Sequence, residues 1–253
     1  IKFNEKIAGK LKSGLSLHYL NQYLEHNIVE NSIKEFVRKN KNKITNNKDF
    51  KNILEANSNQ NLDWFFNELI YSRNKIDYKI TNAKKANDSI EVTIKNLGDT
   101  QVPVSIYGYN NNKLVSKNWV ENNAETFKFY VKNDSITKFV LNDNYEIPEI
   151  NNNNNSYKLK NRFLGNRKIR FTFFKDIENA KYNQVFYVPT AEFNLYDGLL
   201  LGIKFNNKSI IDKPFTYDIT PNLSTKTGTI AGYTGITFNH LNRNSNNFST
   251  KYS

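Results

Sequence analysis

The side chains that most often bind metals or move protons are scarce in this chain of 253 residues. It contains no cysteine, which excludes disulfides, thiolate metal sites and cysteine nucleophiles. Its three histidines are His18, His26 and His240. An HExxH zinc site needs two histidines four residues apart on one helix, with a glutamate that acts as the base, and the sequence has no such motif. We therefore predict no catalytic, cofactor-binding or metal-binding residue in this chain, and no stoichiometric zinc.

The segment around His18 has a helical pattern. Apolar residues recur at three- and four-residue spacing over residues 6–57, which predicts three helices packed as antiparallel hairpins. Asn46 or Asn47 is expected to cap the third helix, with Asp49 in the first turn, where the helix dipole favours an anion. A histidine beside such an apolar stripe is usually a packed helix residue, so we do not assign His18 as a ligand.

An aromatic-rich run from Asn61 to Tyr71 ends the helical region. It predicts a fourth helix with one heavily apolar face, formed by Leu62, Phe65, Phe66, Leu69 and Ile70. The next strand is expected about six residues later, so the two layers must pack closely. We expect Trp64 and Phe65 to join the helices to the following β layer and not to contact substrate.

From residue 77 the apolar period changes to two, which is typical of half-buried antiparallel strands. Turn signals at 97–99 and 110–112 separate roughly six or seven such strands, a number and spacing typical of a β-sandwich. We predict helices over residues 1–75 and an immunoglobulin-like β-sandwich over residues 76–148. The clearest alternations are Ile90, Val92, Ile94, then Val102, Val104, Ile106, then Phe127, Phe129 and Val131.

The next segment is rich in asparagine. It contains Pro148 and five consecutive asparagines, Asn151 to Asn155. A polar tract without apolar periodicity cannot offset the entropy lost on ordering it. We therefore predict a linker over residues 149–157, with Asn151 to Asn155 as an exposed hinge between separable units.

A second β-rich unit is expected over residues 158–253. Runs of about ten residues between turns are typical of a transmembrane β-barrel, and they fit a soluble sheet as well. Residues 227–238 alternate apolar with small or hydroxyl residues, as a lipid-facing strand with a wet inner face would. The predicted fold class is α+β multidomain: helical hairpins, an immunoglobulin-like sandwich and a second β-rich, partly barrel-like unit.

Three signals in the first 71 residues resemble, in order and spacing, the membrane alanyl aminopeptidase-type zinc peptidases, the gluzincins. They are the Ser13–Gly14 step that leads a helix, the pair Asp49 and Phe50, and the run of residues 61–71. In that family such a run closes the catalytic half before an immunoglobulin-like domain that buttresses it. Residues 182–190 and 194–198 also resemble the C-terminal extension of Bacteroidetes-type gluzincins.

This resemblance implies a zinc enzyme that hydrolyses peptide substrates. In the family, zinc activates water, the HExxH glutamate is the base, and a tyrosine stabilises the oxyanion. None of those groups can be assigned here, and the positions nearest to the tyrosine are Lys10 and Leu11. Because the chain begins at Ile1 and lacks methionine, we interpret it as the C-terminal part of a parent protein whose zinc site lies upstream.

The formal net charge is +12, which raises the question of an anionic partner. The lysines are spread through every segment, and no RNP-type or recognition-helix pattern is visible, so we predict no nucleic-acid partner. No apolar run approaches the roughly 20 residues of a membrane helix. We expect a location in the cell envelope, at the outer membrane or in the periplasm, with membrane contact through the C-terminal β unit.

Two hypotheses remain. The first is the C-terminal, structural part of a zinc aminopeptidase-like metallopeptidase. The alternative is a non-catalytic outer-membrane or surface protein, in which a helical cap and a β-sandwich serve binding or assembly. An upstream HExxH motif with a further glutamate would favour the first hypothesis.

Overall fold

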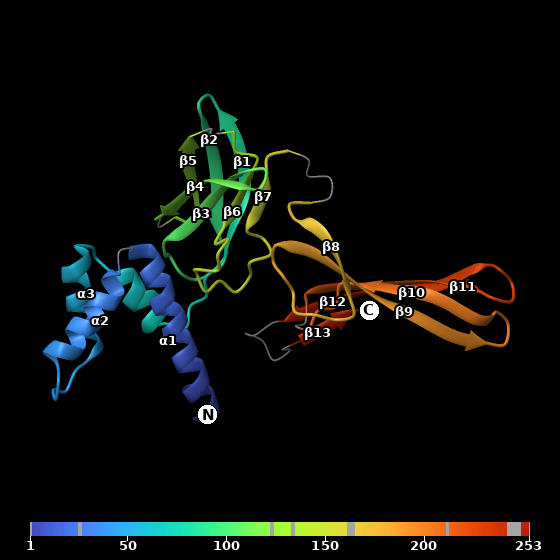
Figure 1. The fold of residues 1–253 in the computed structure, drawn as a ribbon, viewed down its shortest axis with the longest axis horizontal. Helices are drawn as coiled ribbons and strands as arrows, with labels where there is room; N and C mark the ends of the chain where they lie inside the picture. The colour runs from blue at the N-terminus through green and yellow to red at the C-terminus, as the bar shows by residue number, and fades with distance from the viewer. Residues whose placement is uncertain are drawn as a thin grey trace. The chain divides into compact units, whose positions relative to one another are not determined.

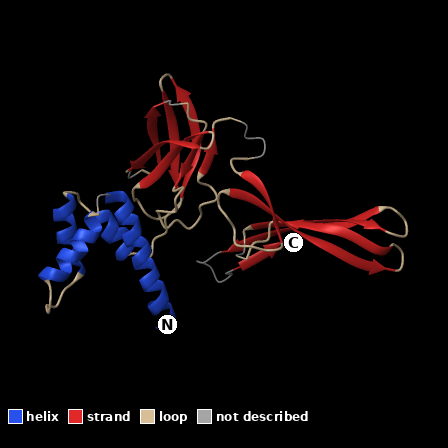
Figure 2. Ribbon diagram, in the orientation of Figure 1, coloured by secondary structure: helices blue, strands red, loops and turns tan. Residues whose placement is uncertain are grey.

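The computed structural model describes residues 2–24, 27–121, 124–132, 135–160, 165–210, 213–241 and 249–252. The chain folds as two compact units, Ile1–Arg162 and Phe163–Ser253, called unit 1 and unit 2 below. It is an α+β chain in which the described helices all precede the described strands (Figures 1 and 2). The predicted boundary lay at residues 149–157, whereas the two units divide at Arg162 and Phe163.

Unit 1 begins with three α-helices, α1 (Lys2–Leu24), α2 (Ile28–Lys39) and α3 (Asn47–Ser58). Asn46 caps α3 because its side-chain oxygen accepts hydrogen bonds from the backbone of Lys48 (2.8 Å) and Asp49 (3.3 Å). Asp49 returns the contact by accepting a 2.8 Å bond from the backbone N–H of Asn46, which completes a capping box. Of the two predicted caps, Asn46 is the one used. None of the described helices is long and apolar enough to cross a lipid bilayer.

The predicted fourth helix is a π-helix over most of its length, η1 (Phe65–Ile70). The backbone N–H of Tyr71 donates to the carbonyl of Phe66 at 2.8 Å, five residues back, where an α-helix would pair residues four apart. The wider turn keeps Phe65, Phe66 and Leu69 buried together. The predicted apolar face is therefore present, although the prediction of an ordinary α-helix is wrong for these residues.

Two antiparallel sheets complete unit 1. One has the order β1-β2-β5, from β1 (Tyr78–Ala86), β2 (Ser89–Asn96) and β5 (Thr126–Lys132). The other has the order β4-β3-β6-β7, from β3 (Val104–Asn110), β4 (Lys113–Val120), β6 (Lys138–Leu141) and β7 (Ser156–Lys158). Their inner residues and those of the helices form one continuous core, which includes Ile90, Val92, Ile94, Val104 and Ile106. The alternation predicted for Ile90, Val92 and Ile94 is an alternation of burial, whereas in β3 Ser105 and Tyr107 are buried together with Val104 and Ile106.

The asparagine tract is part of unit 1, and the prediction of an exposed hinge there is wrong. Asn155 is buried, and the backbone of Leu141 donates a 3.0 Å hydrogen bond to its carbonyl. Strand β7 begins at the next residue and pairs with β6. The tract is ordered by hydrogen bonds instead of apolar contacts, and apolar periodicity carries no signal of such bonds.

Unit 2 is a six-stranded sheet of order β13-β12-β11-β10-β9-β8, and its described strands do not close into a ring (Figure 1). The neighbouring strands are antiparallel except for β8 and β9, which are parallel. The turns that follow β9 and β11 lie at the same end, where Thr225 donates a 2.9 Å bond to the carbonyl of Leu199. The strands are β8 (Lys168–Phe173), β9 (Tyr182–Asn194), β10 (Gly198–Asn206), β11 (Phe215–Ser224), β12 (Ile230–Leu241) and β13 (Ser249–Tyr252).

Candidate functional site

The histidines do not form a metal centre in the part of the chain that the structure describes. His18 and His240 are exposed, in unit 1 and unit 2 respectively, and His26 lies outside the described residues. Among the described residues, no group of three His, Cys, Asp or Glu side chains could hold a metal ion. The described chain therefore offers no donor set for zinc, and the upstream location of the zinc site stays a prediction.

The helices and the sheets of unit 1 are joined by four aromatic rings. Tyr19 and Tyr23 of α1 lie 5.4 Å from the ring of Trp64, centroid to centroid, and 5.8 and 5.5 Å from that of Trp119 on β4. The edge-to-face contacts of Tyr23 suit the charge distribution of aromatic rings. Trp64 contacts Tyr19, Tyr23 and Phe65, which are all helix residues, so the ring contact with the sheet runs through the two tyrosines and Trp119. Trp119 was not predicted, because a single tryptophan in an exposed-looking strand carries no periodic signal.

Both tyrosines also donate hydrogen bonds to the β layer. The Tyr19 hydroxyl donates to the carbonyl of Pro103, and the Tyr23 hydroxyl donates to the carboxylate of Glu121. Burial, followed by the hydrogen bond to Glu121, raises the pKa of Tyr23, so this phenol stays protonated and remains a donor. The junction is an ordered packing contact, and in the described chain it presents no nucleophile and base within reach of each other.

A buried carboxylate holds the asparagine tract. Glu149 accepts hydrogen bonds from the backbone of Tyr78 (2.9 Å) and from the side-chain amides of Asn142 (2.9 Å) and Asn155 (2.6 Å). Burial raises the pKa of Glu149 to about 7, against the lowering effect of these three donors. The neighbouring Asp77 accepts a 2.9 Å bond from Asn154. This cluster explains the order of the tract and joins β1 to β7.

The sheet of unit 2 has one apolar face that is exposed to solvent. In β10 the exposed positions are Leu199, Leu201 and Ile203, whereas Leu200 between them is buried. Directly opposed residues share a face, so the registers Leu201 with Leu223 and Phe215 with Phe238 extend this surface over β11 and β12. We call this surface the apolar face: Leu199, Leu201, Ile203, Phe215, Ile219, Leu223, Ile236 and Phe238.

The opposite side of the same sheet is polar. Thr216, Thr220, Asn222 and Ser224 alternate with the apolar residues of β11 and are buried. The Thr190 hydroxyl of β9 donates a 3.0 Å bond to Asn222 of β11, and this bond passes over Gly202 of the intervening β10. A side chain at residue 202 would collide with the Asn222 oxygen, so glycine is required there. We call this surface the polar face.

The chain matches known proteins in structure but not in sequence. No protein-family model matches the chain, and no curated protein matches it. Among solved structures, the chain is similar to the crystal structure of Legionella pneumophila aminopeptidase A in complex with aspartic acid, at 14% sequence identity and a TM-score of 0.46. The alignment covers 55% of this chain and 17% of that chain, so this chain spans less than a fifth of its length. A backbone likeness at this level carries no argument about activity.

Proposed function

We propose that this chain is the non-catalytic C-terminal part of a zinc-dependent, aminopeptidase-like metallopeptidase of the gluzincin type. The observation that supports this most is the position of the run of residues 61–71. The motif resembles a segment that closes the catalytic half in that family, and here Trp64 packs on Tyr19 of α1 and on Phe65, which belongs to the continuous core of unit 1. The zinc ion and the peptide substrate would be bound by residues that precede Ile1.

In this proposal unit 1 has a mechanical role. Its two sheets act as an immunoglobulin-like sandwich that supports the closing helices. The continuous core from Leu20 through Phe65 to Ile106 makes the two layers one folding unit, so the orientation of the helices is fixed by the sheets. A rigid support of this kind positions a catalytic half without contributing a reacting group.

Unit 2 is proposed as a β-rich, partly barrel-like module that attaches the protein to a membrane in the cell envelope, at the outer membrane or on its periplasmic side. The apolar face supports this, because contiguous exposed apolar surface on one side of a sheet marks an interaction or membrane site. The polar face behind it carries small and hydroxyl residues, which are buried and so leave the apolar face as the exposed side of β11. The same exposed face favours the alternative function, a non-catalytic surface protein for binding or assembly.

The experiment that separates these functions compares this chain with its full-length parent. Both are dialysed, their zinc content is measured, and hydrolysis of aminoacyl p-nitroanilides is followed. The proposal expects bound zinc and hydrolysis for the parent and neither for this chain. A parent without zinc and without hydrolysis would favour the binding or assembly protein. Stoichiometric zinc in this chain that is lost on replacing His18 or His26 would contradict the upstream location of the site.

A further inference from the structure

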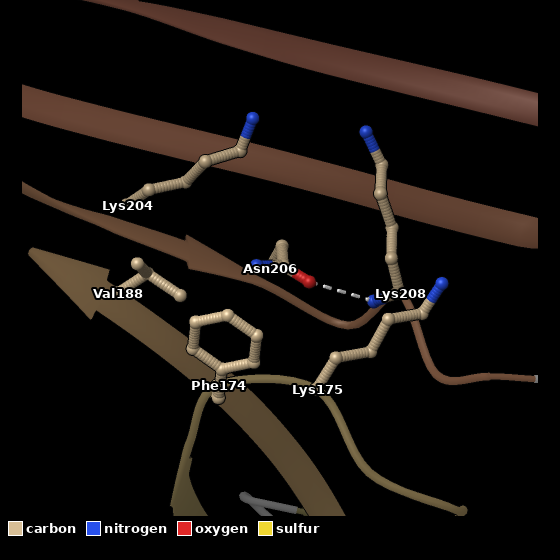
Figure 3. Close-up of a pocket in the computed structure, with 6 residues that line it drawn as sticks. All are labelled: Phe174, Lys175, Val188, Lys204, Asn206 and Lys208. Atoms are coloured by element: carbon tan, nitrogen blue, oxygen red, sulfur yellow. Dashed lines mark hydrogen bonds between the residues drawn. The ribbon is translucent and has the colours of Figure 1, made fainter. Parts of the chain in front are cut away.

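A lysine-lined cleft opens on the polar face of unit 2 at the end of β10. Its walls are Phe174 and Lys175, which follow β8, together with Val188, Lys204, Asn206 and Lys208, and it encloses about 230 Å³. Figure 3 shows that the side chains of Lys175 and Lys208 start close together and that their amine ends point in different directions, with the Phe174 ring close to Val188. An adjoining cavity of about 220 Å³ shares Lys175 and Lys208 and is bordered further by Ser209, Lys213, Thr216 and Lys251.

The cleft holds more positive than negative charge. Asp218 binds Lys208 and lies 3.8 Å from Lys204, and Glu178 binds Lys213 at 2.8 Å. The hydrogen bond from Lys208 lowers the pKa of Asp218, so this carboxylate is already engaged. Among the described residues, the two cavities are lined by five lysines, and two carboxylates pair with three of them.

Lys175 lines both cavities and is the lysine of the cleft that pairs with no described carboxylate. Within the described residues it has no carboxylate partner. The nearest acidic neighbour in sequence, Asp176, accepts a 2.7 Å bond from the backbone of Ile177 and lines neither cavity. An ammonium group without a carboxylate partner can bind an added anion through charge-assisted hydrogen bonds.

The apolar wall of the cleft includes a residue with a strained backbone conformation, Phe174. Phe174 has φ of 64°, a left-handed conformation that is unfavourable for a bulky side chain. A 3.0 Å hydrogen bond from its backbone to the carbonyl of Tyr187 holds it there, and the ring is 62% exposed. The strained residue thus places an aromatic ring beside the lysines, where an organic group could contact it.

We propose that this cleft binds a phosphate monoester that carries an apolar group. The phosphate lies between Lys175 and Lys208, and the apolar group packs on Phe174 and Val188. Lysine binds phosphate as a point charge without a fixed fork, and a phosphate offers it more charge and more acceptor oxygens than one carboxylate does. This site goes beyond the proposed metallopeptidase function and does not depend on it.

The test is calorimetric titration of the full chain with phenyl phosphate and with inorganic phosphate at low ionic strength. Phenyl phosphate is expected to bind one to one and more tightly than inorganic phosphate. Lys175→Gln and Lys208→Gln should each weaken it about tenfold, the loss of one charge-assisted hydrogen bond. Phe174→Ala should weaken phenyl phosphate and leave inorganic phosphate unchanged. Lys226→Gln is the matched control, because this lysine lies in the β11–β12 turn and lines neither cavity.

Two further arms make the result decisive. Lys175→Arg should keep binding, which separates loss of charge from loss of fold, and circular dichroism confirms folding of each variant. Vesicles containing phosphatidic acid test a lipid headgroup as the source of the phosphate; binding that phenyl phosphate displaces supports the cleft. The proposal is overturned if phenyl phosphate does not saturate or if Lys226→Gln weakens its binding as much as Lys175→Gln does. Vesicle binding that Lys175→Gln and Lys208→Gln leave unchanged is attributed to the apolar face and overturns phosphatidic acid as the source of the phosphate.

Discussion

Glu149 accepts a hydrogen bond of 2.6 Å from Asn155, so a titratable carboxylate lies against the last residue of the asparagine tract. Because burial raises the pKa of Glu149 to about 7, the folded chain binds a proton there at pH values where the unfolded chain has already released it. The contribution of this group to stability is therefore complete below the unfolded pKa and falls as the pH rises toward 7.

The first prediction is that unfolding free energy decreases across this window by up to about 1.4 kcal/mol per pH unit from Glu149 alone. Urea unfolding of the chain and of Glu149→Gln at a series of pH values measures the difference. The Glu149→Gln variant should be less stable, because its side-chain NH2 group would lie next to one of the N–H donors that bond to Glu149. Its unfolding free energy should also depend less on pH. Equal slopes for the two chains would contradict the assignment.

The second prediction concerns the asparagine tract. Asn155→Ala removes a buried donor to Glu149 and should lower the free energy of unfolding by about 1 to 3 kcal/mol. Asn151→Ala, in the same tract, loses only a local bond to the backbone of Asn153 and should cost less than about 0.5 kcal/mol. Chemical denaturation distinguishes the two. Equal small effects would restore the picture of an exposed hinge.

The third prediction tests the packing of η1. Phe65 is buried, and Phe65→Ala should cost about 3 to 5 kcal/mol and lower the melting temperature of unit 1. Ile44→Ala is the control, since Ile44 is fully exposed, and this variant should have the same melting temperature as the unchanged chain. In an active full-length parent, Phe65→Ala should reduce the yield of folded enzyme without changing peptide selectivity. A change of selectivity with normal melting would show that η1 lines the substrate channel.

The fourth prediction compares the two tyrosines at the aromatic junction. Tyr19→Phe leaves the buried carbonyl of Pro103 without its donor and should cost about 1 to 3 kcal/mol. Tyr23→Phe leaves the exposed Glu121 free to bind water and should cost less. Thermal unfolding of both variants gives the order, and a larger loss for Tyr23→Phe would contradict this account of the junction.

The fifth prediction concerns the apolar face. Leu201→Asp and Ile203→Asp should each weaken binding of the chain to lipid vesicles in a flotation assay. The reason is that covering this face with lipid would remove the aspartate carboxylate from water, which costs free energy. Lys226→Gln changes the net charge by the same one unit in the β11–β12 turn and should float like the unchanged chain. If all three variants float equally, lipid does not cover this face.

The sequence predicted those parts of the fold in which burial repeats along the chain. Ile90, Val92 and Ile94 alternate because one side of β2 faces the core, and that alternation is visible without coordinates. The π-turn in η1 was not predictable, since the apolar spacing of Phe65, Phe66 and Leu69 fits an α-helix and a π-helix alike. The order of Asn155 depends on Glu149 and Asn142, and hydrogen bonds between such residues leave no period in the sequence.

The candidate sites were harder to foresee. The exposed apolar residues of β10 and β11 alternate along the chain, but alternation alone does not show whether that side of a strand is covered. The cleft joins Lys175, which follows β8, with Lys204 and Lys208 at the end of β10, and the register of β8, β9 and β10 brings these two segments together. The lysines are scattered along the sequence, and their positions do not reveal which of them meet at one end of a sheet. For this reason the cleft was not predicted.

The two bonds from α1 to the β layer set an order of events during synthesis. Tyr19 and Pro103 are separated by 84 positions, and Tyr23 and Glu121 by 98. A helix emerging from the ribosome has no partner for either hydroxyl until β3 and β4 have left the exit tunnel. Because long-range contacts of this kind form late, the two tyrosine rings can pack on Trp64 first, and their hydroxyls stay bonded to water until the β layer forms.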